Sequence, residues 1–188
     1  MSLSFLPNLL CVLRILLVYP VAHGILQGLY PQVLALFAVA AFTDGLDGFL
    51  AKRFDWRSEL GKVLDPLADK LLLVTVFICL SVAGLAPWWL AALVLLRDLV
   101  IFFGALTFKW LFGPVRGSPT AASKINTFCQ IVFCLAVVAQ AAFGLPSSGI
   151  VTALGALVVV STAVSGIDYV LIYSQRAAGV SRARAAAG

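Results

Sequence analysis

Long apolar stretches, separated by short connections with Gly, Pro or charged residues, dominate the pattern of this chain. A helix that crosses a bilayer needs about 20 mostly apolar residues. With Gly, Pro and charge taken as boundaries, the pattern predicts six such helices. Their predicted ranges are residues 8–28, 31–52, 62–84, 87–109, 122–143 and 148–174. We therefore expect an all-α, polytopic membrane bundle of six transmembrane helices.

Basic residues are distributed unevenly among the connections between these segments. The connections near residues 28–32, 83–87 and 144–149 contain no Lys or Arg, whereas the other two connections and the end of the chain are basic. The basic positions are Lys52, Arg53, Arg57, Lys62, Lys109, Arg116, Lys124, Arg176, Arg182 and Arg184. Because basic loops remain on the cytoplasmic side, we expect both termini in the cytoplasm and a multi-pass protein of the inner (cytoplasmic) membrane.

The composition leaves little room for a soluble domain. Of the 188 residues, 62% are hydrophobic and 11% are charged, whereas soluble domains have about 25% charged residues. We expect a single membrane domain over residues 1–188, with residues 175–188 as a flexible basic tail. The net charge is +5, but no basic run with interleaved aromatic residues occurs outside the apolar segments, so no nucleic-acid partner is expected.

Four carboxylates lie within a short part of the chain, at the predicted cytoplasmic ends of the second and third segments. Asp44 and Asp47 are three residues apart, and Asp65 and Asp69 are four residues apart, so each pair shares one helix face. Unpaired carboxylates near a bilayer are costly, which suggests bound cations. Oxygen ligands without nearby Cys or His favour Mg2+ or Mn2+. Two such divalent cations can clamp a diphosphate.

An alternative is that these carboxylates form interfacial ion pairs with neighbouring basic residues. The possible partners are Lys52, Arg53, Lys62 and Lys70. Small residues accompany the carboxylates, however: Gly48 and Ala51 continue one face, and Gly61 precedes Asp65 by four residues. Ion pairing does not require this spacing, whereas close approach of a helix or a flat phosphate-bearing ligand does.

The stretch from Asp44 to Asp69 resembles the signature of the CDP-alcohol phosphatidyltransferase family, D-x2-D-G-x2-A-R-x8-G-x3-D-x3-D. All four Asp residues and both motif Gly residues match. Lys52 stands where the family usually has Arg. Lysine retains the positive charge of arginine but lacks its planar guanidinium group. Pro7-Asn8-Leu9-Leu10, with Arg14 in the first segment, also looks like the family's opening.

The resemblance implies transfer of a phosphatidyl group from CDP-diacylglycerol to an alcohol, with release of CMP, by a homodimer whose active site faces the cytoplasm. It implies that Asp44, Asp47, Asp65 and Asp69 hold two divalent cations and that Asp69 is also the general base. The nucleotide-binding residues that it implies are Asn8, Gly48, Ala51, Lys52 and Gly61.

Basic and polar residues further along the chain point to an acceptor that carries phosphate. Arg97, Arg116 and Lys124, together with Asn126, are the candidates for binding it. Alternatively, Arg97 forms an ion pair with Asp98 or Asp168 that serves only helix packing. Lys124 could likewise extend only to the cytoplasmic interface, as long basic side chains do. The family that the chain resembles includes enzymes with two such acceptors, phosphatidylglycerol and glycerol 3-phosphate. The run Pro119–Gln130 is similar to the cardiolipin-forming branch, whose acceptor is phosphatidylglycerol.

A small transporter or channel is the competing class, because it also places charges inside a bundle. Its charges should line a path across the whole bilayer, but the three non-cytoplasmic connections hold no charged residue. A structural scaffold would not explain the Asp spacing, so we favour the enzyme. Two further expectations concern packing and depth: Gly24, Gly28, Gly155 and Gly166 allow close helix packing, and Trp88, Trp89 and Tyr30 lie at the non-cytoplasmic interface.

Overall fold

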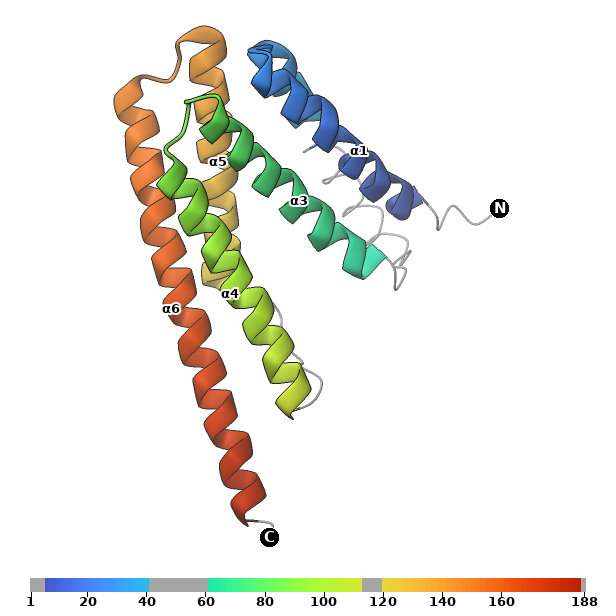
Figure 1. Ribbon diagram of the computed structural model, residues 1–188, viewed down its shortest axis with the longest axis vertical. Helices are drawn as coiled ribbons and strands as arrows, with labels where there is room; N and C mark the ends of the chain where they lie inside the picture. The colour runs from blue at the N-terminus through green and yellow to red at the C-terminus, as the bar shows by residue number, and fades with distance from the viewer. Residues whose placement is uncertain (1–5, 41–60, 113–119, 187–188) are drawn as a thin grey trace. The chain divides into compact units, whose positions relative to one another are not determined.

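The computed structural model describes residues 6–40, 61–112 and 120–186, and the regular structure in these ranges is helical throughout (Figure 1). This confirms the all-α class for the described residues. The helices are α1 (Leu6–Leu26), the helix Tyr30–Ala40, α3 (Gly61–Val82), α4 (Trp88–Phe112), α5 (Ala121–Phe143) and α6 (Ser148–Ala186). Each of the six predicted segments overlaps one of these helices, and the described boundaries differ by a few residues except at the end of α6.

Three of the described helices are long and apolar enough to cross a membrane. They are Trp88–Phe108, Ala121–Phe143 and Ser148–Ile172. Shorter apolar helices cover Val12–Leu26, Tyr30–Ala40 and Lys70–Val82. The structure thus supports a helical membrane protein, while the count of six spans and the cytoplasmic placement of both termini stay predictions.

The expectation that residues 175–188 form a flexible basic tail stays a prediction. The helix α6 itself extends beyond the predicted sixth segment, as far as Ala186. The physical reason is composition, because Ala and Arg, which are frequent in this stretch, are among the residues with the highest helix propensity.

The chain divides into two compact units, each of which has its own packing. The first contains Met1–Ala91 and Cys134–Val151, and the second contains Ala92–Phe133 and Thr152–Gly188. Because α4, α5 and α6 each contribute residues to both units, neither unit is formed by a continuous piece of chain.

In the first unit, α1 packs against α3 and approaches the helix Tyr30–Ala40 closely. Its fully buried apolar side chains include Val21, Ile25 and Val33. Gly24 makes the close approach possible, since a Cβ atom at this position would lie 2.7 Å from Cγ2 of Val33. The expectation that Gly24 is a packing glycine is therefore confirmed.

Gly28 has a different role from the one expected. It ends α1 in the left-handed region, with φ 74°, and the Leu29 N–H donates to the carbonyl of Gly24 at 2.8 Å. This is a Schellman cap, which glycine favours because it has no Cβ atom. Gly84 ends α3 in the same way, with φ 74°. The prediction of close packing at Gly28 was wrong, because no heavy atom lies nearer than 4.0 Å to its missing Cβ position.

In the second unit, α6 is antiparallel to α5 and parallel to α4. The α5–α6 register follows from two contacts: Asn126 bonds to Ser161, and Phe133 packs 3.3 Å from the missing Cβ position of Gly155. Gly155 thus allows close packing as expected, whereas Gly166 does not, because no heavy atom lies within 4 Å of its Cβ position.

Two hydrogen bonds between α4 and α6 fix how these helices pack, and both join residues with the same separation in sequence. Arg97 bonds to Ser165, and the Tyr169 hydroxyl donates to the Ile101 carbonyl at 2.8 Å, both across 68 residues. Gly104 lies beneath the Tyr169 ring, with its missing Cβ position 3.0 Å from Cε1. The parallel pairing is thus built from a hydrogen bond and a close backbone approach at neighbouring turns.

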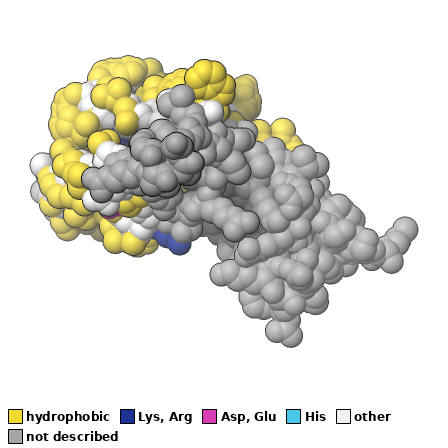
Figure 2. All heavy atoms as spheres, turned by 90° about the horizontal axis from the view of Figure 1, so that it is seen from below, with side chains coloured by type: hydrophobic (Ala, Val, Ile, Leu, Met, Phe, Trp, Pro, Cys, Tyr) yellow, Lys and Arg dark blue, Asp and Glu magenta, His cyan; other side chains and the backbone are white. Residues whose placement is uncertain are grey.

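Hydrophobic side chains cover much of the described surface, as Figure 2 shows for one face. On α4, Trp88 and Trp89 are 58% and 61% exposed at one end, and Trp110 is 85% exposed near the other. These ends are about 33 Å apart along the helix, at 1.5 Å per residue. This separation is close to the thickness of a bilayer core, about 30 Å, and exposed tryptophans favour its two interfaces. The interfacial role of Trp88 and Trp89 stays a prediction.

The close approach at Gly24 yields a stability prediction. Gly24→Val introduces a branched side chain where even one Cβ atom meets Val33, so we expect a loss of about 1–3 kcal/mol of stability. The measurement is the thermal unfolding temperature in detergent. Gly149→Val is the matched control, because the Cβ position of Gly149 is in open space. Equal unfolding temperatures for the two variants would contradict this packing.

Candidate functional site

The first half of the candidate metal site lies on α3. This helix is continuous from Gly61 to Val82 and therefore places Asp65 and Asp69 one turn apart on the same face. Pro66 lies within its second turn, where the helix continues through it. Gly61, a predicted nucleotide-binding residue, is the first residue of this helix.

The second half of the predicted metal site lies outside the described residues. Asp44 and Asp47 belong to it, as do the predicted nucleotide-binding residues Gly48, Ala51 and Lys52. Within the described ranges, no group of three or more His, Cys, Asp or Glu side chains occurs. Asn8 lies in the first turn of α1, and Arg14, one or two turns further along, is only 1% exposed.

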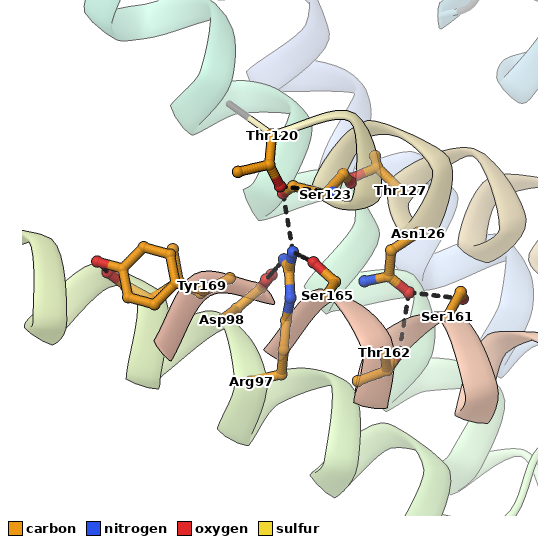
Figure 3. Close-up of polar contacts among 11 residues, drawn as sticks. Arg97, Asp98, Thr120, Ser123, Asn126, Thr127, Ser161, Thr162, Ser165 and Tyr169 are labelled. Atoms are coloured by element: carbon orange, nitrogen blue, oxygen red, sulfur yellow. Dashed lines mark hydrogen bonds and ion pairs between the residues drawn. The ribbon is translucent and has the colours of Figure 1, made fainter. Parts of the chain in front are cut away.

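A polar network in the second unit is centred on Arg97 of α4, which is 7% exposed (Figure 3). Its Nη1 donates to Oδ1 of Asp98 at 2.7 Å. Its Nη2 donates to Oγ of Ser123 on α5 at 2.8 Å and to Oγ of Ser165 on α6. One guanidinium group thus joins three helices. Of the two packing partners considered for Arg97, Asp98 is the one that it contacts.

A second polar layer lies one helical turn from the first. Oδ1 of Asn126 on α5 accepts hydrogen bonds from Ser161 at 2.9 Å and from Thr162 at 3.0 Å, both on α6. Asn126 is completely buried. Because Asn126 follows Ser123 by three residues and Ser165 follows Ser161 by four, the two layers lie on the same pair of helix faces. They form a continuous polar strip between α5 and α6.

The N-terminus of α5 lies beside the Arg97 layer. Oγ1 of Thr120 accepts from the Ser123 N–H at 3.2 Å, which is the geometry of a capping residue. The first turn contains no acidic residue, and Lys124 is exposed there. The positive end of the helix dipole thus lies beside the Arg97 guanidinium, which also pairs with Asp98, and Lys124 adds a positive charge in the same turn of α5. A positively charged helix N-terminus favours an anion.

Three buried nitrogen atoms of this unit have no hydrogen-bond acceptor in the described part of the chain. They are Nε of Arg97, Nδ2 of Asn126 and Nε2 of Gln130. In Figure 3 the amide nitrogen of Asn126 lies on the side of Arg97, while its oxygen faces Ser161 and Thr162. All three atoms are donors, and buried donors require an acceptor. An oxygen-rich group such as a phosphate or a hydroxyl supplies one.

The structure brings together some predicted acceptor residues and leaves others apart. The first two turns of α5 contain Lys124 and Asn126, and Arg97 of α4 contacts the first of these turns through Ser123. Arg116 lies outside the described residues. Sequence reasoning missed Ser161, Thr162 and Ser165, although their spacing of i, i+1 and i+4 in an apolar helix marks a polar face.

The sequence matches the CDP-alcohol phosphatidyltransferase family over residues 4–172. Because this match covers most of the chain, the chain belongs to the CDP-alcohol phosphatidyltransferase family. Family membership confirms the resemblance that the Asp44–Asp69 signature indicates, and it places the chain in an enzyme class rather than among transporters or channels.

Individual relatives carry two kinds of name. The chain is 32% identical to the CMP-forming cardiolipin synthase of Rattus norvegicus, over 87% of this chain and 60% of the relative. The human protein of the same name is 31% identical, with the same coverage of each chain. A probable phosphatidylglycerophosphate synthase of Mycobacterium tuberculosis is 34% identical, over 72% of this chain and 63% of the relative. The chain thus spans about 60% of the length of these curated relatives.

The Arg97 layer yields a second stability prediction. Ser123→Ala and Ser165→Ala each remove one acceptor from the charged Nη2, and each should lower the unfolding free energy by about 1.5–3 kcal/mol. The double variant should lose more than the sum, because it leaves a buried charged donor without either acceptor. Unfolding in detergent, monitored by circular dichroism, measures these losses.

The control for these variants is Ser174→Ala on the same helix. Ser174 is exposed, and its hydroxyl donates only within α6, to the Leu171 carbonyl at 2.9 Å. We expect this variant to unfold like the original chain. If Ser165→Ala does too, the Arg97–Ser165 hydrogen bond does not stabilise the helix pair.

Proposed function

We propose that this protein transfers a phosphatidyl group from CDP-diacylglycerol to phosphatidylglycerol, giving cardiolipin and CMP at the cytoplasmic face of the inner membrane. The observation that carries the proposal is the Asp44–Asp69 signature, whose second carboxylate pair lies on the continuous helix α3. The names of the rat and human relatives support the reaction. A homodimer is the assembly that the family resemblance supports.

The four Asp residues act on the diphosphate of the donor. Asp44, Asp47, Asp65 and Asp69 hold the divalent cations, Mg2+ or Mn2+, and neutralising the diphosphate charge is the chemistry that these ions supply when bound. Asp69 takes the proton from the acceptor hydroxyl. The acceptor oxygen then bonds to the phosphatidyl phosphorus, and the bond from that phosphorus to the CMP oxygen breaks, so that CMP leaves.

The nucleotide lies where small residues allow close approach. Gly48, Ala51 and Gly61 bring the backbone near the cytidine, while Lys52 supplies a positive charge and Asn8 supplies a polar group. Lys52 is a point charge rather than a planar fork, so it binds the nucleotide without a bidentate contact.

The acceptor's phosphate lies at the N-terminus of α5. Lys124 is exposed in the first turn, Nε of Arg97 and Nδ2 of Asn126 need acceptors, and Arg116 adds a further charge. Nη1 and Nη2 of Arg97 are already bonded to protein atoms, so Arg97 meets the acceptor through Nε. Its other hydrogen bonds fix the orientation of the guanidinium group.

Glycerol 3-phosphate is the alternative acceptor, because it also carries a phosphate. The name of the Mycobacterium tuberculosis relative favours it, as does that of a chloroplastic CDP-diacylglycerol–glycerol-3-phosphate 3-phosphatidyltransferase from Oryza sativa, which is 31% identical over 90% of this chain. The run Pro119–Gln130 favours phosphatidylglycerol, since it is similar to the cardiolipin-forming branch.

An acceptor assay separates the two reactions. Purified protein with CDP-diacylglycerol and Mg2+ should release CMP when phosphatidylglycerol is added, and much less when glycerol 3-phosphate is added instead. The measurement is CMP by chromatography, with a reaction lacking acceptor as the blank. Release with glycerol 3-phosphate alone would establish the alternative acceptor.

The base and metal roles yield a further prediction. Asp69→Asn removes both a metal ligand and the proton acceptor, so CMP release should fall at least about 100-fold, the usual contribution of a general base. Chelation by EDTA should have a similar effect, and excess Mg2+ or Mn2+ should restore the rate. Asp168→Asn is the matched control on α6, outside the signature. A normal rate for Asp69→Asn would refute its assignment as base.

A further inference from the structure

An apolar groove of about 430 Å3 runs between α4 and α6 in the second unit. On α4, its lining residues repeat at i, i+3, i+4 and i+7, and on α6 they recur at each turn. They include Leu96, Arg97, Val100, Thr162, Gly166 and Ile167. All of these residues lie within the two apolar helix segments Trp88–Phe108 and Ser148–Ile172. Arg97 and Thr162 are the two polar members.

Gly166 creates part of the groove. No heavy atom lies within 4 Å of its missing Cβ position, so the space is not filled by a neighbouring side chain. Glycine inside a helix is less favourable than alanine by about 1 kcal/mol. Since no close helix contact requires it, the glycine is explained better by a ligand that lies against α6 than by packing of the protein with itself.

The groove is continuous with the proposed acceptor site, because Arg97 belongs to both. One side of Arg97 lines the groove, and its Nη2 donates to Ser123 in the first turn of α5. Thr162 likewise lines the groove and donates to Asn126. A ligand that reaches both regions needs a phosphate at one end and a long apolar chain at the other. Arg97 is complementary to the phosphate, and the leucine, isoleucine and valine side chains are complementary to the chain.

We propose that the α4–α6 groove binds an acyl chain of the acceptor lipid and thereby selects a phospholipid acceptor over a water-soluble one. The inference rests on the proposed function and extends it to a specificity-determining surface. Glycerol 3-phosphate has no apolar chain and would use only the polar part of the site. The energetic gain comes from van der Waals packing and a fixed orientation, because the chain is also surrounded by hydrocarbon when it lies in the bilayer.

The test compares Gly166→Leu with the original chain, using phosphatidylglycerol with long (dioleoyl) or short (dihexanoyl) acyl chains and dioleoyl CDP-diacylglycerol as donor. A leucine at this position fills the groove without meeting another atom at its Cβ. We expect kcat/KM for the long-chain acceptor to fall about fivefold, through KM, while that for the short-chain acceptor is unchanged. Gly149→Leu is the matched control, because its Cβ position is also open and it does not line the groove.

The same variants distinguish other occupants of the groove. If shortening the donor's chains abolishes the effect of Gly166→Leu, the groove binds the donor, and the inference is wrong. An equal fall with both acceptors, or none with either, also overturns it. Failure of the original chain to release CMP with any acceptor would refute the proposed function instead.

A binding measurement makes the inference independent of turnover. Phosphatidylglycerol with a photoreactive group on one acyl chain should crosslink to Leu96, Val100 or Ile167 in detergent–lipid micelles, without donor present. Gly166→Leu should reduce this crosslinking and Gly149→Leu should not. If the crosslinking yield is the same in Gly166→Leu and Gly149→Leu, the lipid contacts the helix surface nonspecifically, and the inference is wrong.

Discussion

The hydrogen bonds of Arg97 are the interaction on which the second unit depends. A guanidinium group that is 7% exposed on a membrane helix is costly unless it is paired and hydrogen-bonded. Asp98 supplies the opposite charge, and Ser123 and Ser165 accept from Nη2. Because those two acceptors lie on different helices, satisfying one side chain fixes α4 against both α5 and α6.

This arrangement also limits what Arg97 can do in chemistry. Its two terminal nitrogens are bonded within the protein, so a bidentate grip on a phosphate would require breaking the contacts that join the helices. The donors that lack acceptors are instead Nε of Arg97 and the amide nitrogens of Asn126 and Gln130. In the proposed site the phosphate is therefore bound by several single donors and by the N-terminus of α5, with Arg97 held in a fixed orientation.

The sequence predicts helices better than it predicts their contacts. Apolar length and boundary residues locate all six helical segments, because each helix satisfies its own backbone hydrogen bonds locally. The side-chain partners depend on register between distant helices: the sequence leaves Asp98 and Asp168 as alternative partners of Arg97, and it does not indicate Ser165. It also misassigns Gly28, because a cap and a packing glycine look alike until the backbone angle is known. Residues 41–60 carry half of the proposed metal site and lie outside the described structure, so that half still depends on the sequence signature.

Acceptor selectivity in such a site follows from connecting polar and apolar surfaces, rather than from either alone. A phosphate-binding helix N-terminus can bind either phosphatidylglycerol or glycerol 3-phosphate, since the phosphodiester of the first and the phosphomonoester of the second both present anionic oxygens. An apolar groove alone accepts any lipid of the bilayer. Arg97 and Thr162 lie where the polar strip meets the groove, and a molecule must carry phosphate and acyl chain together to contact both. In the proposed site, acceptor discrimination would follow from the parallel packing of α4 and α6, which places Arg97 and Gly166 on the two sides of one groove.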